Sequence, residues 1–125
     1  MAEFLRSTFI VFTSFGFLIA AASATQAAGA LAVGVCGAYG YAVDYSKAEE
    51  ARRVALNKCS GQCKIVPVKR ASAAFAVDGR NPCGAHGFAT NARLAQAQNI
   101  ALRHCYRHGG RDCVIRAWAC DGGRS

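Results

Sequence analysis

Two stretches of this chain repeat each other, and the repeat is the feature that most restricts its fold. The segment Cys-Gly-Ala-Tyr-Gly-Tyr-Ala at 36–42 returns as Cys-Gly-Ala-His-Gly-Phe-Ala at 83–89. Each copy is followed by an alanine-containing helix tail, at 55–59 and 101–105, and then by a cysteine that opens a short apolar run. A repeated unit of this length is typical of a supersecondary element that stacks on its own copy to bury a shared core.

The first copy has the pattern of a β-hairpin, a helix and a third strand. Strands are expected over 30–33 and 38–43, because a glycine-containing turn separates two apolar runs. A helix is expected after a cap at residue 46 and runs to about 59, with alanines at helical spacing on one face and basic residues opposite them. The last strand, 64–68, is expected at a sheet edge since Pro67 has no N–H for a neighbouring strand.

Both helices carry sequence signals for their ends. Ser46 and Glu49 have the spacing of a capping box, in which the serine accepts from the first helical amides and the glutamate reaches back. Thr90 or Asn91 is expected to cap the second helix. Gly61 follows the first helix, where a residue in the left-handed conformation often closes a helix.

The second copy repeats the order of the first. Strands are expected over 75–77 and 85–89, and a helix follows that ends at the glycine pair 109–110. The last strand is expected over 114–118, and residues 121–125 are expected to fray.

These elements predict one small α+β domain, residues 28–125, made of two tandem β-hairpin–α–β repeats at about 30–72 and 73–120. We expect an antiparallel or mixed sheet that carries both helices on one face, stabilised by disulfides. No long linker or low-complexity tract divides the chain.

The N-terminus has the pattern of a signal peptide over residues 1–27. A short start with a single base, Arg6, precedes an apolar run at 9–22 and then small residues, and cleavage after Ala24 or after Ala27 fits the rule for signal peptidase. The run is too short and interrupted for a membrane span of roughly 20 apolar residues. An uncleaved anchor is the alternative, since the positive charge at the start is weak. No transmembrane span is expected after processing.

Removal of the leader leaves 98 of the 125 residues, and the net charge stays at +8 because the leader holds one acid and one base. All seven cysteines lie in the remaining domain. A domain of this size often needs covalent support. We therefore expect disulfides and a periplasmic or secreted location. Seven is an odd number, so one thiol is free or bonds another chain.

The spacing resembles a family of bacterial secreted proteins, domain of unknown function 4189, over about 29–120. The resemblance rests on the Ala-x-Ala and Tyr-Gly-Tyr-Ala hairpin, on the alanine-spaced helix with its two cysteines at 59 and 63, on the looser second copy, and above all on Ala-Trp-Ala-Cys at 117–120. It implies export and the doubled cysteine module. It carries no catalytic residue, because the family has no assigned activity. Where the family pattern often has a cysteine before the second hairpin, this chain has Ser72.

Four cysteines bracket helix ends and strand starts in the same context twice. We interpret them as two local disulfides, Cys59–Cys63 and Cys105–Cys113. A redox motif would have two intervening residues rather than three or seven, and a zinc site needs four clustered ligands. Metal and redox sites remain the alternatives.

Three cysteines are left, and one further disulfide is expected among Cys36, Cys83 and Cys120. The residues alone do not choose the pair, although Cys36 and Cys83 are equivalent in the two copies. The family resemblance, with Ser72 in place of a cysteine, makes Cys120 the candidate for the unpaired thiol.

The candidate catalytic groups are sparse. His104 and His108 lie four apart, a spacing that suits metal ligands, but basic groups in a last helical turn also complement the helix dipole. The carboxylates fall at helix starts, turns and loops, and no serine lies in a nucleophile elbow. We expect no catalytic, cofactor or metal site, and no enzyme.

Basic residues crowd the end of the second copy, at 103, 107, 111 and 116. Arg103, Arg107 and Arg111 form a candidate anion-binding surface, with a solvated surface as the alternative. Specific nucleic-acid binding is not expected, because no recognition motif accompanies the charge. The hairpin aromatics could form a binding face, although such residues more often pack in a core; they are Tyr39, Tyr41, Tyr45 and Phe88.

The sequence thus predicts a small exported, cysteine-rich protein that works by binding an anionic envelope polymer or another protein. A small secreted hydrolase is the alternative. A surface patch of aromatic or basic residues would favour the first, and a cleft with converging histidine and carboxylate groups the second.

Overall fold

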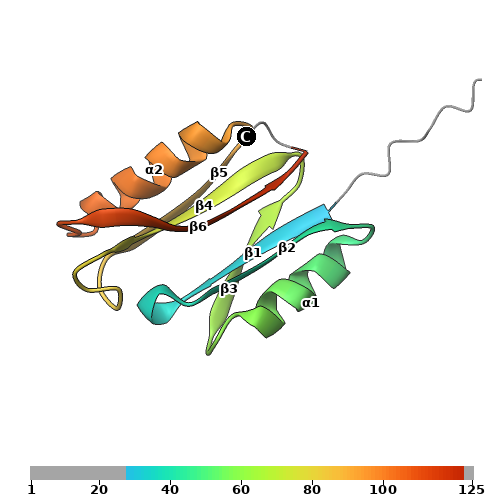
Figure 1. Ribbon diagram of the computed structural model, residues 1–125, viewed down its shortest axis with the longest axis horizontal. Helices are drawn as coiled ribbons and strands as arrows, with labels where there is room; N and C mark the ends of the chain where they lie inside the picture. Colours follow the sequence, from blue (N-terminus) through green and yellow to red (C-terminus); the bar gives the residue numbers. More distant parts are fainter. Residues whose placement is uncertain (1–27, 123–125) are drawn as a thin grey trace, which may run out of the picture.

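The computed structural model describes residues 28–122. The predicted leader, residues 1–27, with both of its cleavage motifs, lies outside the described residues. Figure 1 shows the arrangement of the elements. Their order is β1 (Ala28–Gly34), a 3₁₀ turn η1 (Val35–Gly37), β2 (Tyr39–Tyr45), α1 (Ala48–Lys58), β3 (Cys63–Val68), β4 (Ala71–Asp78), β5 (His86–Asn91), α2 (Leu94–Arg107) and β6 (Cys113–Asp121). Neither helix of the described part is long and apolar enough to cross a membrane.

Each repeat folds into the same unit. The two sheets have three antiparallel strands each, in the orders β2-β1-β3 and β5-β4-β6. Their registers correspond: Ala32 of β1 lies opposite Gly40 of β2, and Ala76 of β4 lies opposite Gly87 of β5. The α+β class and the two similar units predicted from the sequence are confirmed.

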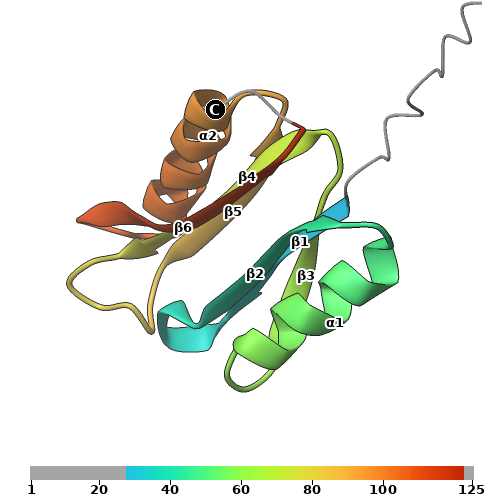
Figure 2. The ribbon, with the colours of Figure 1, turned by 45° about the vertical axis from the view of Figure 1, so that its right-hand side comes forward.

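The two units keep separate sheets. This differs from the arrangement expected from the sequence, a single sheet with both helices on one face. The sheets pack against each other, and α1 and α2 cover the two outer faces (Figures 1 and 2). The reason lies in the central strands, which are apolar on both sides. In β1, Ala30 and Ala32 face α1 while Leu31 and Val33 face the other sheet, and residues 73–77 of β4 repeat this alternation of small and large side chains.

The main core lies between the two sheets. Phe75 and Leu31, both fully buried, are its largest side chains. Its members come from both units and are Leu31, Val33, Val66, Val68, Ala73, Phe75, Val77, Ala117 and Ala119. Neither unit could bury its large apolar face alone, so the repeat folds as one domain.

Each helix lies directly on its hairpin at a glycine. A Cβ built on Gly40 would lie 2.7 Å from Cβ of Lys58 and closer still to the carbonyl oxygen of Ala55. A Cβ built on Gly87 would lie 2.6 Å from Cβ of His104, in the same relation to α2. Small residues at these two positions allow each helix backbone to approach the sheet.

The first helix begins without the predicted capping box. Its N-cap residue is Lys47, and no side chain makes a capping hydrogen bond there. The first turn closes instead through the backbone, where the N–H of Ala51 donates to the carbonyl of Lys47 at 3.2 Å. The Ser46–Glu49 prediction is wrong because the helix starts at Ala48, one residue later than that box requires.

The second helix also begins later than predicted. Its N-cap is Arg93 rather than Thr90 or Asn91, because β5 continues through Asn91. Oδ1 of Asn91 accepts a hydrogen bond from the backbone N–H of Arg93 at 3.1 Å, and this closes a turn just before the helix.

Contacts between the units come in equivalent pairs. Strands β1, β2 and β3 correspond to β4, β5 and β6. The contact of β2 with β6 has its equivalent in the contact of β5 with β3, and the contact of β1 with β6 has its equivalent in the contact of β4 with β3. Reciprocal contacts of this kind are the pattern of an isologous interface, which a two-fold axis generates. The molecule therefore has an approximate internal two-fold axis.

The last strand departs from the symmetry and from the sequence-based expectation. It carries one extra residue, Arg116, because Ile115 lies opposite Ala76 while Ala117 lies opposite Phe75. It also continues through Asp121, which is only 1% exposed, so the prediction that this residue frays is wrong.

Candidate functional site

The structure contains three disulfides. Cys59–Cys63 and Cys105–Cys113 each join the end of a helix to the start of the next strand, as expected for local pairs. The third, Cys36–Cys83, joins equivalent turns of the two units.

Cys120 is the one free thiol in the described part of the chain. It is partly buried and accepts a hydrogen bond from the hydroxyl of Ser72 on the neighbouring strand. Ser72, which stands where the family pattern often has a cysteine, therefore lies directly against the unpaired thiol.

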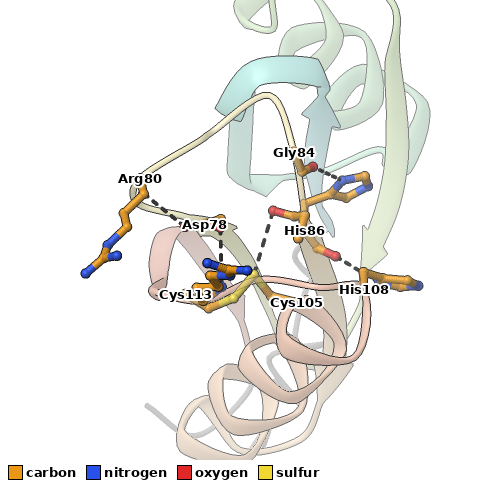
Figure 3. The surroundings of a disulfide bond; sticks show 9 residues. Asp78, Arg80, Gly84, His86, Cys105, His108 and Cys113 are labelled. Carbon is orange, nitrogen blue, oxygen red and sulfur yellow. Dashed lines mark hydrogen bonds between the residues drawn. A yellow bond between two sulfur atoms is a disulfide. The ribbon is translucent and has the colours of Figure 1, made fainter.

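Figure 3 shows the surroundings of the second local disulfide. Nδ1 of His108 lies 3.1 Å from the carbonyl oxygen of His86, in position to donate to it, and the two rings are 6.5 Å apart. His104 lies elsewhere on α2, with its Cβ near Gly87. His104 and His108 therefore do not form a pair; His108, at the C-terminal cap of α2, lies instead beside His86 at the start of β5. Within residues 28–122 no three groups of metal-ligating type come together.

Asp78 organises the loop beside this disulfide (Figure 3). Its carboxylate accepts hydrogen bonds from the backbone N–H of Arg80 at 3.0 Å and of Arg111 at 3.3 Å. The bond from Arg80 contributes most to holding the pKa of Asp78 below its ordinary value, burial opposes it, and the bond from Arg111 adds to the lowering. This acid has a structural task.

Asp78→Asn is expected to lower the stability of the protein at neutral pH. The folded-state pKa of Asp78 lies below its unfolded value, so its contribution is complete above about pH 4 and is lost as the pH falls through the folded pKa. The melting temperatures of the two proteins should therefore differ at pH 7 and converge near pH 2. Asp112→Asn is the control, because that side chain is exposed and its ion pair with Arg80 is long, at 4.0 Å. A constant difference across the pH range would contradict this role.

The three arginines of the predicted anion-binding surface lie at one end of the second unit. Arg103 and Arg107 are exposed on α2, and Arg111 is exposed in the loop that follows. Arg111 also binds Asp78 through its backbone, not its guanidinium. None of these guanidinium groups pairs with an acid of the described residues, where the one salt bridge is Arg80–Asp112.

A groove of about 440 Å³ lies between β2 and β6, one edge strand from each sheet. Trp118 and Tyr41 remain 53% and 46% exposed there, so both offer aromatic surface to a ligand. We call this surface the aromatic groove; its residues are Tyr39, Tyr41, Val43, Leu94, Arg116, Ala117, Trp118, Ala119 and Cys120.

Arg116 is held in the aromatic groove by contacts to the other unit. Its Nε donates to the carbonyl oxygen of Gly37 at 3.1 Å, and its guanidinium carbon lies 5.3 Å from the centre of the Tyr39 ring. The extra residue in β6 places it there, and such bulges often redirect a side chain beside a functional site. The result is a fixed positive charge among aromatic side chains.

A second, smaller groove of about 310 Å³ lies at the equivalent place between β5 and β3. His86 and Phe88 take the positions that Tyr39 and Tyr41 have in the first unit. Lys64 lies 5.2 Å from the centre of the Phe88 ring. The four predicted hairpin aromatics therefore do not form one face.

Sequence reasoning counted Arg116 among the basic residues at the end of the second copy but did not place it beside aromatic side chains, and its binding faces did not include Trp118. A signal for Trp118 was available, because successive side chains of a strand point to opposite faces. Ala117 and Ala119 are buried, so Trp118 between them points to the exposed face. No sequence signal gives the position of Arg116, because it depends on a bulge and on a contact between the units.

The family model "Domain of unknown function (DUF4189)" matches residues 28–120, which cover both units. The chain belongs to this family. No curated protein and no solved structure matches it. As a member of DUF4189, the chain has the doubled module expected from its sequence.

Proposed function

We propose that this protein is an exported binding module that holds its ligand in the aromatic groove. The observation that carries the proposal is the combination of two exposed aromatic side chains, Tyr41 and Trp118, with the fixed guanidinium of Arg116 in one groove. Aromatic faces bind flat or apolar groups and a fixed cation selects negative charge. A ligand with an apolar face and an anionic group fits this chemistry, as an envelope polymer or a protein segment would provide.

Charge and disulfides support the same assignment. The net charge of +8 would attract anionic ligands from a distance. Three disulfides suit an oxidising compartment such as the periplasm or the medium. A binding module needs no catalytic residues, and a hydrolase remains the alternative to be tested.

Trp118 is the single tryptophan of the chain, so its fluorescence reports directly on the aromatic groove. We expect peptidoglycan fragments or an anionic polysaccharide such as polygalacturonate to shift its emission in a saturable way, and neutral dextran to leave it unchanged. Arg116→Gln should weaken the affinity about tenfold by removing the fixed charge. Rising salt should weaken binding to the unchanged protein as well.

The matched control is the triple variant Arg103→Gln, Arg107→Gln and Arg111→Gln, which lies outside the groove and should retain most of the affinity. Its melting temperature should also hold, because exposed charges contribute little to stability. If this variant loses binding while Arg116→Gln keeps it, the ligand occupies the arginine surface at the end of α2 and the groove assignment is refuted. Breakdown of a probe would support the hydrolase alternative.

A further inference from the structure

Asp121, the last residue of β6, is a buried acid with unmet hydrogen-bonding capacity. It is 1% exposed, and neither carboxylate oxygen has a hydrogen-bond partner among the described residues. A carboxylate in such a place is unfavourable unless a cation or several donors approach it. Arg70 precedes the strand opposite Asp121, but its side chain is exposed and forms no ion pair with Asp121 in the described part.

The carboxylate lies at the start of β1. A Cβ built on Gly29 would be 3.1 Å from both Cβ and Oδ2 of Asp121, so glycine leaves room for the acid there. Within the first sheet, Ala28 lies opposite Tyr45, the neighbour of Asp44 in β2. Two acids therefore lie around the first two residues of this strand.

The electrostatics of the two acids agree with this placement. Burial raises the pKa of Asp121 above its ordinary value, and the negative charge of Asp44 raises it further. A cation between them would relieve both effects. None of the basic side chains in residues 28–122 forms a salt bridge with either acid.

We propose that Asp121 is the receptor for the α-ammonium group of Ala28, which is created when the leader is removed after Ala27. Ala28 is one residue from Gly29, which contacts Asp121, and Ala27 ends one of the two cleavage motifs in the sequence. An α-amino group has an ordinary pKa of about 7.7–8.0 and is largely charged at neutral pH. It supplies a positive charge and three N–H donors, whereas the peptide nitrogen of the uncleaved chain supplies one neutral donor.

Cleavage of the leader is then a step that completes the fold. With the leader attached, no basic side chain of residues 28–122 forms an ion pair with Asp121. After cleavage, the new amino group pairs with it and ties the first strand to the last. The inference rests on the proposed export but not on ligand binding in the aromatic groove.

The first experiment determines where the chain is cut. The full chain is exported in a bacterial host, and the intact mass of the product gives its first residue. We expect Ala28. A product that begins at Thr25 would overturn the inference while leaving export intact, and an uncut product would refute export itself.

The second experiment tests the pairing by a reversal of sign. The product that begins at Ala28 is compared with the same chain carrying Ser-Gly before Ala28, each with Asp121 or with Asp121→Asn. Asp121→Asn should lower the melting temperature of the first protein by several degrees, because the ammonium loses its partner. It should leave unchanged or raise that of the extended protein, where the acid is unpaired. Asp112→Asn, at an exposed acid, should have the same small effect in both.

A third measurement keeps the test decisive if Asp121→Asn does not fold. The rate of α-amine acylation is followed against pH in the product that begins at Ala28. Pairing with Asp121 should raise the pKa of the amine above its ordinary value, so labelling at pH 7–8 should be severalfold slower than in the Ser-Gly form. Equal labelling rates in the two proteins would overturn the proposal, as would equal effects of Asp121→Asn. It would also be overturned if Ca²⁺ stabilised the extended protein to the level of the cut one.

Discussion

Replacing Gly40 or Gly87 by alanine is expected to destabilise the protein by about 3 kcal/mol in each case, at the upper end of the usual cost of overpacking. The added methyl group would overlap the backbone of the helix that lies on the glycine, at Ala55 or at Ala101. Neither backbone segment can move away without opening the small-residue layer between helix and sheet. Urea unfolding monitored by circular dichroism would measure both losses.

Gly61→Ala is the matched control for these substitutions. Gly61 has a positive φ of 81° but nothing within 4 Å of a built Cβ, so it isolates the backbone strain from the steric overlap. Its loss should be about 1 kcal/mol. If all three substitutions had similar effects, the close approach of the helices would not be what requires glycine at 40 and 87.

Removal of the Cys36–Cys83 disulfide is expected to cost the most among the three bonds. It closes a loop of 47 residues, for which the chain-entropy model gives about 4 kcal/mol, against about 2 kcal/mol for the Cys59–Cys63 loop of 4. Small domains have a total stability of about 5–15 kcal/mol. The double variant Cys36→Ser and Cys83→Ser should therefore be close to unfolding at 37 °C.

The double variant Cys59→Ala and Cys63→Ala serves as the comparison, and Cys120→Ser reports on the loss of a thiol alone. The loss in the free energy of unfolding should be larger for the bond that closes the longer loop. Equal losses for the long and short loops would show that the bond between the units acts through local geometry and not by restricting the unfolded chain.

Much of the fold could be predicted from the sequence because the repeat supplies the same signals twice. Apolar alternation, glycine turns and alanine spacing gave the strands and helices within a few residues. The helix caps at Ser46 and Thr90 or Asn91 failed because strand pairing and backbone contacts decide where a helix can begin. A local motif does not contain that information.

The number of sheets was harder to foresee. Residues 30–33 are apolar throughout, and this pattern fits a strand covered on both sides. Their alternation of alanine with larger side chains specifies a helix on one side and a second sheet on the other. The candidate site depends on that packing: the aromatic groove forms from edge strands of different units, and the position of Arg116 depends on a bulge.

The bond between equivalent cysteines matches the geometry of a covalent homodimer. Equivalent positions meet only where they lie close to a two-fold axis, and the bonded Cys36 and Cys83 do so. A half-length protein with one cysteine at this position could therefore cross-link to a second copy of itself. Its large apolar face would have required that partner, since the core lies between the units. Cys36 and Cys83 thus occupy the places that a disulfide-linked homodimer of half-length chains would use.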